Sequence, residues 1–321
     1  MGTRRYTSEE YKSGIIDLHG VGGHPLITVF TPTWNRAHLL SRAFDSLLIQ
    51  SKKNFEWIIY DDGSTDETEQ VVRGWLDRAD FRIHYIKSKN RGKAAAMNAG
   101  AELANGELFL VLDSDDAASS NAMEKFDQVW RDLADTGLRD RYAGMSALKA
   151  TFDGVLVGDG YELLERAQAS YIERSNLGVA GDKWEIIRTD LVRAHPYPLA
   201  SGERYMAPSY SWLVIARHHL TAFINEPLGL IEYQADGISA NNIRNRVNSP
   251  VSTYRYYSEF YGDRRFRFRC RLNFTANMNR FALHGGGKLV VWDFMALVLL
   301  PVSCAFYLID RFRLRSILGP K

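Results

Sequence analysis

The stretch Glu107–Asp116, ELFLVLDSDD, decides the fold that the sequence predicts. A short, mostly apolar run of the kind expected for a buried strand leads directly into four polar residues. Three similar runs precede it, and a helical pattern follows each of them. These strands are predicted at Leu26–Thr33, Phe55–Tyr60 and Arg82–Ile86, and the helices at Ala37–Gln50, Thr65–Arg78 and Lys93–Ala104. Strands that alternate with helices on short loops predict an α/β fold with a parallel sheet covered on both faces.

The alternation fades after about Ser120, where one more helix is predicted at Asn121–Leu133. Further strands are then predicted at Tyr142–Thr151, Gly154–Val157, Tyr161–Leu164 and Lys183–Arg188. These favour a mixed sheet whose second half builds a pocket against the first. We therefore expect a loosely ordered N-terminal lead-in over 1–25, a main domain over 26–235 and a separate C-terminal region over 236–321.

Polar motifs stand at the predicted strand ends, where ligands bind in a parallel α/β sheet. They are TPTWNR (31–36), DDGSTDET (61–68), NRGKAAAMNAG (90–100) and LDSDD (112–116). Trp34 offers a planar face to a nucleobase, and Asp62 can accept a hydrogen bond from a base. Gly92 opens a helix whose free N–H groups favour phosphate, and Lys93 adds a positive charge. Asp113 and Asp115 can converge on one hard divalent cation.

Each motif alone has a simpler interpretation. Asp-Asp-Gly-Ser is a common turn, Trp34 could belong to the core, and the acids at 113–116 could cap the helix that follows. Their occurrence together at successive strand ends favours a ligand site.

This set of motifs resembles family 2 glycosyltransferases with the GT-A fold, and the resemblance covers roughly 26–235. It implies a Rossmann-like mixed sheet and an inverting enzyme that uses a nucleoside-diphosphate sugar, most often a UDP-sugar, with Mg²⁺ or Mn²⁺. By matching position, it implies metal ligation by Asp113, Asp115 or Asp116. It implies nucleotide-sugar binding by a larger set, which comprises Thr31, Pro32, Trp34, Asn35, Asp62, Asn90, Gly92, Lys93, Asp113 and Ser114.

An inverting transfer needs a general base for the acceptor hydroxyl. The segments beginning Gly181-Asp182-Lys183 and ending Gly202-Glu203-Arg204-Tyr205 resemble a bacterial polysaccharide subgroup, which nominates Glu203 as the base. Asp182 is the rival, either as base, as acceptor contact or as a partner for Lys183. The subgroup often carries a second acid where this chain has Pro208-Ser209, so any role of that acid is missing or relocated here.

Charge divides the 321 residues unevenly although the total is only +2. Residues 236–321 hold 14 Lys and Arg against five acids, a net +9, which leaves −7 for residues 1–235. Ample apolar content excludes collagen-like and low-complexity disordered chains, and a single long apolar run excludes a polytopic membrane protein. The two cysteines have no metal or disulfide spacing, so a reducing compartment is expected.

The basic, aromatic segment 254–284 suits nucleic acid or anionic lipid equally. The apolar run 289–309 that follows favours lipid and excludes nucleic acid as the expected partner. Only 16 residues, Phe294–Ile309, are free of charge, fewer than a bilayer span requires. With Pro301 near the centre and cations at both ends, we expect a re-entrant or in-plane element, and a membrane-surface contact over 254–315. A buried core helix and a full span are the alternatives.

These observations predict a transferase at the cytoplasmic face of the plasma membrane that adds a sugar to a polyprenyl-diphosphate-linked saccharide. Three alternatives stay open. They are a polyprenyl-phosphate glycosyltransferase that acts on the bare lipid phosphate, a nucleotidyltransferase, and a noncatalytic nucleotide-sugar-binding module. The nucleotidyltransferase is disfavoured because TPTWNR lacks a glycine-rich loop.

Overall fold

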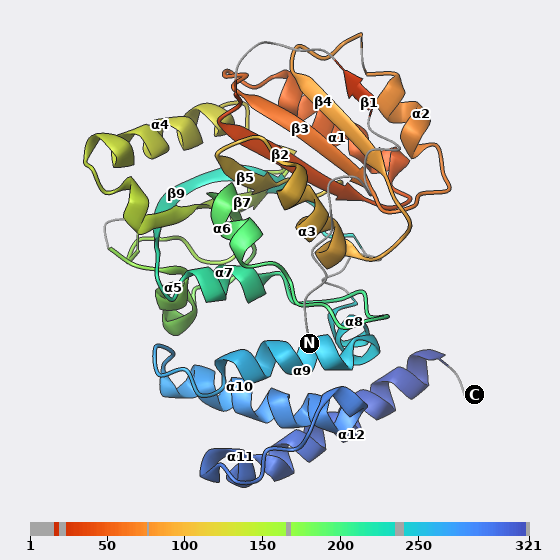
Figure 1. The fold of residues 1–321 in the computed structure, drawn as a ribbon, viewed down its shortest axis with the longest axis vertical. Coiled ribbons are helices and arrows are strands. Elements are labelled where there is room, and N and C mark those ends of the chain that lie inside the picture. The colour runs from red at the N-terminus through yellow and green to blue at the C-terminus, as the bar shows by residue number, and fades with distance from the viewer. Residues whose placement is uncertain (1–15, 19–23, 76, 165–167, 235–240, 319–321) are drawn as a thin grey trace. The chain divides into compact units, whose positions relative to one another are not determined.

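The computed structural model describes residues 16–18, 24–75, 77–164, 168–234 and 241–318 (Figure 1). The chain divides into two compact units. Unit 1 comprises Met1–Pro196 and Leu213–Tyr233, and unit 2 comprises Tyr197–Trp212 and Gln234–Lys321. Most of the predicted lead-in, and the predicted boundary at 235–236, lie outside the described residues.

Unit 1 is built on one nine-stranded mixed sheet in the order β1-β4-β3-β2-β5-β8-β7-β9-β6. The strands are β1 (Ile16–Leu18), β2 (Ile27–Thr33), β3 (Phe55–Asp61), β4 (Arg82–Lys87), β5 (Leu108–Val111), β6 (Ala117–Ala118), β7 (Tyr142–Thr151), β8 (Lys183–Arg188) and β9 (Leu220–Ile231). Strands β4, β3, β2 and β5 run parallel, whereas β8 is antiparallel to both β5 and β7. The sheet is therefore mixed, as the sequence predicts, with the parallel part first.

Helices cover both faces of this sheet because alternate strand residues are apolar on each side. The helices of unit 1 are α1 (Ala37–Leu48), α2 (Thr68–Arg73), α3 (Lys93–Leu103), α4 (Ala122–Asp135), α5 (Tyr171–Leu177) and α6 (Thr189–Ala194). On one face Phe44 of α1 and Phe126 of α4 belong to the same buried cluster as Trp57 of β3. On the other, α3 lies so close that a Cβ at Gly100 would sit 2.2 Å from the Phe30 ring.

One predicted strand, Tyr161–Leu164, is wrong, because these described residues do not pair in the sheet. Tyr161 is buried because it packs against Phe223. The hairpin or edge strand predicted at Gly154–Val157 is reduced to an isolated antiparallel bridge between Leu156 and Ala150. Three strands were not predicted: β1, which lies in the expected lead-in, the two-residue β6, and β9, whose apolar pattern is interrupted by Asn225-Glu226-Pro227.

Unit 2 is helical in its described part. Its elements are α7 (Ser209–Ile215, which runs on into unit 1), α8 (Asn242–Asn248), α9 (Pro250–Phe260), α10 (Phe268–Phe281), a π-helical turn (Ala282–Gly286), α11 (Phe294–Val298) and α12 (Leu300–Leu318). Much of the basic, aromatic segment forms the core of this unit, since Tyr257, Phe260, Phe274 and Phe281 are buried against one another. These rings stabilise the fold and are not a lipid-facing surface.

The apolar run 289–309 is broken into two helices. Asp293 begins α11 by accepting a hydrogen bond from the backbone N–H of Ala296, and Pro301 lies in the first turn of α12. In the described part of the chain, no helix is both long and apolar enough to cross a bilayer.

Candidate functional site

The strand ends that carry the sequence motifs meet at one edge of the unit 1 sheet. Thr33 is in register with Asp61, and Asp61 with Lys87, so β2, β3 and β4 end together. Strand β5 runs parallel beside β2 and ends two residues before Asp113. The four motifs therefore lie along one edge, as the sequence predicts for a parallel sheet.

Asp62 holds the loop that precedes α3. Its carboxylate accepts hydrogen bonds from the backbone N–H groups of Arg91, at 2.8 Å, and Gly92, at 2.7 Å. Gly63 has a φ of +86°, and a Cβ on it would lie 3.0 Å from the backbone nitrogen of Asn90. This close approach brings the predicted residues Asp62, Asn90 and Gly92 together. It also gives the Asp62 carboxylate a positioning contact that the sequence did not reveal.

Hydrogen bonds also join the loop after β2 to the loop after β3. The backbone N–H of Asn35 donates to Ser64 Oγ at 2.8 Å, and Asn35 Oδ1 accepts from the Thr65 N–H at 2.8 Å. Asn35 adopts a φ of +52°, which asparagine tolerates better than most residues. Trp34 is 53% exposed, so its ring is open for stacking, and the neighbouring Pro32 is half-buried.

Thr31 differs from the prediction. Its side chain is fully buried, and its hydroxyl accepts a hydrogen bond of 2.9 Å from the indole N–H of Trp57. The residue points into the core because side chains alternate between the two faces of a strand. Its side chain is used for packing and does not reach the edge of the sheet.

Two lysines pair with the acidic cluster after β5. Lys93 Nζ lies 2.5 Å from an Asp113 oxygen, and Lys149 Nζ of β7 lies 2.7 Å from an Asp116 oxygen. Burial opposes ionisation of Asp113, but Lys93 and Lys149 outweigh it and hold its pKa below the ordinary value. Burial raises the pKa of Asp116 to about 6 even though Lys149 lowers it.

Asp115 is different, because in the described part of the chain it forms no ion pair with a cation. Burial raises its pKa, and the nearby Asp113 carboxylate raises it further. A half-buried carboxylate beside a second one is a plausible oxygen ligand for a hard cation. The described residues nevertheless contain no group of three acid, histidine or cysteine side chains arranged to hold a metal. Ser114, the remaining predicted residue, is buried, and it lies between Asp113 and Asp115 in the sequence.

Asp182 lies at the same edge, because β8 begins where β5 ends. The Tyr233 hydroxyl, just past β9, donates to an Asp182 oxygen at 3.1 Å. Burial and Asp182 raise the pKa of Tyr233, and Lys149 and Asp116 also act on it. The Asp182–Tyr233 pair therefore lies within electrostatic range of the Asp116–Lys149 pair. Lys183 is not its partner, since its ammonium is buried and donates to the carbonyls of Val157 and Asp159.

Glu203 belongs to unit 2 and has a structural contact there. One carboxylate oxygen accepts from the Val251 N–H at 2.8 Å and the other from the Ser252 N–H at 2.7 Å. These are free donors of the first turn of α9, so Glu203 caps that helix. Both of its oxygens are engaged, which the sequence motif did not indicate.

Lys149 and Tyr233 were not among the predicted site residues. A signal for Lys149 was present, because it is the one charged residue in YAGMSALKAT, a strand buried over nearly its whole length. A lysine at a buried position requires a partner of opposite charge. For Tyr233 the sequence gives no comparable signal.

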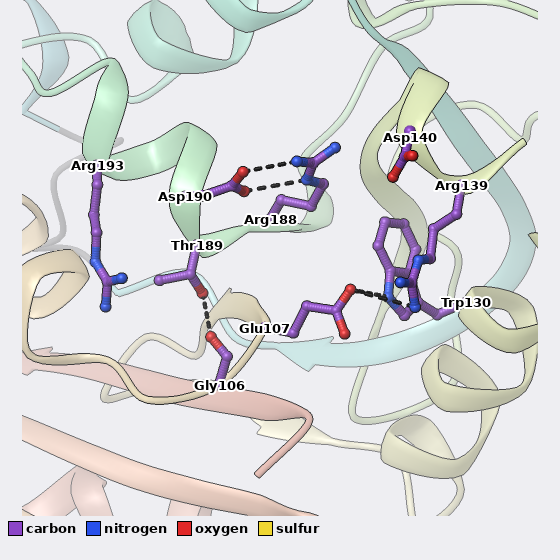
Figure 2. A pocket seen from close by; sticks show the side chains of 9 residues that line it. All are labelled: Gly106, Glu107, Trp130, Arg139, Asp140, Arg188, Thr189, Asp190 and Arg193. Carbon is purple, nitrogen blue, oxygen red and sulfur yellow. Dashed lines mark hydrogen bonds and ion pairs between the residues drawn. The ribbon is translucent and has the colours of Figure 1, made fainter. Parts of the chain in front are cut away.

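A cavity of about 290 Å³ lies elsewhere, at the amino end of β5 (Figure 2). Four of its charged side chains form two pairs, since Arg188 binds Asp190 and Arg139 lies beside Glu107. Thr189 donates to the Gly106 carbonyl at 2.6 Å. The cavity is at the opposite end of β5 from Asp113, so it is no part of the acidic site.

Comparison with known families identifies the parallel half of unit 1. Residues 28–149 match the model described as glycosyl transferase family 2. Over this stretch, which is less than half of the chain, the protein is similar to the family 2 glycosyltransferases. The match includes Asp62, Lys93, the acids at 113–116 and Lys149, whereas Asp182 and Glu203 lie beyond it. The family 2 resemblance of the motifs is thereby confirmed.

Curated relatives of the glycosyltransferase domain match the chain over a limited stretch. An uncharacterized glycosyltransferase of Haemophilus influenzae is 38% identical over 102 residues, which is 32% of this chain and 40% of that protein. The validoxylamine A glucosyltransferase of Streptomyces hygroscopicus is 44% identical over 102 residues, 30% of this chain and 24% of that protein. The chain thus matches well under half the length of these relatives.

Solved structures share the fold over most of the chain. S. aureus TarS 1-349 in complex with UDP-GlcNAc gives a TM-score of 0.56 at 16% identity, covering 88% of this chain and 81% of that one. The mannosyltransferase PcManGT from Pyrobaculum calidifontis, in complex with GDP-Man and Mn²⁺, gives 0.54 at 18% identity, with 91% and 83% covered. A mixed α/β fold of the GT-A type is confirmed.

Proposed function

We propose that this protein is an inverting glycosyltransferase that takes a sugar from a nucleoside-diphosphate sugar, with UDP as the nucleotide. The observation that carries the proposal is the clustering of Asp113, Asp115, Asp116, Lys93 and Lys149 at one edge of the sheet, inside the family 2 domain. Solved structures with a similar fold contain UDP-GlcNAc and GDP-Man, which supports a nucleotide-sugar donor and makes GDP-mannose the alternative to test.

The residues at this edge suit the parts of such a donor. Trp34 is exposed for base stacking, and the loop held by Asp62 presents Gly92 and Lys93 at the start of α3. Asp115, with Asp113 beside it, would hold Mg²⁺ or Mn²⁺ together with diphosphate oxygens. The bound cation would supply positive charge to the departing diphosphate.

For the proton transfer we propose Asp182 in place of Glu203. Asp182 lies at the acidic edge of unit 1, and Tyr233 orients it by a hydrogen bond to one of its oxygens. The acceptor oxygen forms a bond to the anomeric carbon as the bond from that carbon to the diphosphate breaks, and Asp182 takes the hydroxyl proton. In unit 2, Glu203 keeps both oxygens on the α9 backbone.

For the acceptor we propose a membrane-bound, polyprenyl-diphosphate-linked saccharide, reached from the cytoplasmic face. Large apolar side chains are exposed along α11 and α12, with Phe294 82% and Phe312 77% exposed. Others of this kind are Trp292, Leu297, Val298, Val302, Leu308 and Ile309. Helices with exposed apolar side chains and adjacent cations, here Arg311 and Arg313, suit an anionic membrane surface. A polyprenyl-phosphate acceptor is the second candidate, since it would use the same surface.

The donor proposal is tested by nucleotide release from UDP-glucose, UDP-GlcNAc and GDP-mannose, each with Mn²⁺ and with EDTA. We expect release from a UDP-sugar that stops in EDTA and falls at least about 100-fold in Asp115→Asn. Asp135→Asn, which removes an exposed carboxylate on α4, is the matched control and should keep full activity. Release from no nucleotide sugar, or release unaffected by EDTA and by Asp115→Asn, would overturn the proposal.

A further inference from the structure

Arg246 of α8 is a half-buried cation without an acidic partner. In the part of the chain that the structure describes, it forms no ion pair with any carboxylate. Its guanidinium carbon lies 5.5–5.7 Å from the ring centroids of Tyr205, Tyr256 and Tyr257, which surround it. A buried charge that lacks a counterion is costly, and aromatic faces only partly compensate it. The surroundings therefore favour an anion from outside the chain.

The guanidinium is also fixed in orientation with donors to spare. Nε donates to Asn242 Oδ1 at 2.6 Å, and Nη1 donates to the Tyr257 hydroxyl at 3.0 Å. Arginine has five N–H donors, so Nη2 and one N–H of Nη1 remain. Nη2 is not among the polar atoms that are sealed from solvent without a partner, unlike Nε of Arg174 and of Arg271. Nη2 is therefore in contact with solvent.

The residues around Arg246 also make contacts with other parts of unit 2. The Tyr205 backbone N–H donates to Ser249 Oγ at 3.1 Å, and Tyr257 stacks on Phe281 with 9° between the ring planes. The Tyr205 hydroxyl reaches Asn242 Oδ1 at 3.4 Å. A preformed cation with two adjacent free donors matches the paired oxygens of a phosphate-type oxyanion.

We propose that Arg246, within the cage of Tyr205, Tyr256 and Tyr257, binds a phosphate or diphosphate group, and that this group is the one that links the acceptor saccharide to its lipid. The first part stands on the geometry of unit 2 alone. The second part rests on the proposed function. Arg246 belongs to unit 2, whereas the acidic cluster where the donor's diphosphate is expected belongs to unit 1.

The test measures binding of inorganic phosphate, inorganic diphosphate and farnesyl diphosphate to the full chain by calorimetry, without donor or metal. We expect diphosphate to bind, and Arg246→Lys and Arg246→Gln to weaken it about tenfold or more, because the planar pair of donors is lost. Arg244→Gln removes the same charge from the same helix and should bind as the wild type does. Lys93→Gln removes the donor-site cation, and the diphosphate binding that Arg246→Lys weakens should persist in it.

Two results would overturn the site: wild-type affinity in both Arg246 variants, or loss of binding in Lys93→Gln but not in Arg246→Lys. If Arg246→Gln does not fold, Arg246→Lys decides, since it keeps the charge. Farnesyl diphosphate bound more tightly than diphosphate, with farnesol unbound, supports the lipid-linked acceptor, and equal affinities overturn that assignment. Donor turnover is measured separately, so failure of the proposed function can be distinguished from failure of the Arg246 site.

Discussion

Among single residues, Lys149 gives the clearest energetic prediction, because it and Asp116 are both buried and pair with each other. Removing one partner of a buried ion pair leaves the other charge uncompensated. We expect Lys149→Met to lower the free energy of unfolding by about 3–5 kcal/mol. In urea titrations, Lys149→Met combined with Asp116→Leu should recover part of that loss. Strictly additive losses would show that the two side chains do not interact.

Asp182 and Glu203 can be separated by measuring stability and turnover in the same variants. Asp182→Asn should reduce kcat about 10²–10⁴-fold with the unfolding transition unchanged, as expected for loss of a general base. Glu203→Gln should instead lower the free energy of unfolding by about 1 kcal/mol, the usual cost of a weakened helix cap, and keep turnover. If Glu203→Gln lost turnover and Asp182→Asn kept it, Glu203 would be the general base.

At the scale of elements, the Glu56 side chain of β3 contacts the neighbouring strands β2 and β4 of the sheet. Its buried carboxylate accepts from the Thr28 hydroxyl of β2 and the Asn105 N–H before β5, each at 2.6 Å, and contacts His84 of β4 at 3.2 Å. Burial opposes ionisation, but the hydrogen bonds from His84, Thr28 and Asn105 lower the pKa to about 2, from 4.5. The charged form is therefore the one that the fold stabilises.

This lowered pKa has a defined consequence for acid stability. Because the pKa is lower in the folded state, the contribution of Glu56 is complete above about pH 4.5 and is lost as the pH falls towards 2. Glu56→Gln should lower the free energy of unfolding by about 2–3 kcal/mol at pH 7. The difference in the free energy of unfolding between Glu56→Gln and the wild type should become smaller in denaturation curves taken as the pH is lowered from 4.5 to 2.5. A difference that stays constant with pH would contradict this assignment.

Local patterns were enough to predict the parallel half of the sheet and its functional edge. Strands such as β3 are apolar along their length, and each ends in polar residues. In the second half, β7 and β8 were also predicted, whereas β9 and the pairing of side chains depend on contacts that no local pattern contains. Strand β9 carries Pro227 opposite Leu148, where the register with β7 shifts, and the Lys149–Asp116 pair joins residues that are 33 positions apart. The role of Glu203 likewise depends on a helix 48 positions further along the chain.

For the whole molecule, the uneven charge and the exposed apolar side chains predict how the chain partitions onto membranes. We expect the protein to sediment with anionic lipid vesicles at low salt, and less so at 0.5 M salt, because ions screen surface charges over about 4–5 Å at that concentration. Phe294→Ser with Phe312→Ser should reduce the bound fraction about tenfold or more. Leu163→Ser, an equally exposed apolar position in unit 1, is the control. Wild-type protein that stays in the supernatant would contradict the membrane proposal.

The cap that Glu203 places on α9 also bears on the order in which the chain can fold during synthesis. Residues 197–212 belong to unit 2, yet the chain on either side of them belongs to unit 1. Glu203 leaves the ribosome before its partners Val251 and Ser252 are made, so this segment must wait for them. A chain truncated after Tyr233 would keep the segment but never receive those partners. Because the segments of the two units alternate along the chain, a single truncation cannot remove unit 2 and leave unit 1 whole.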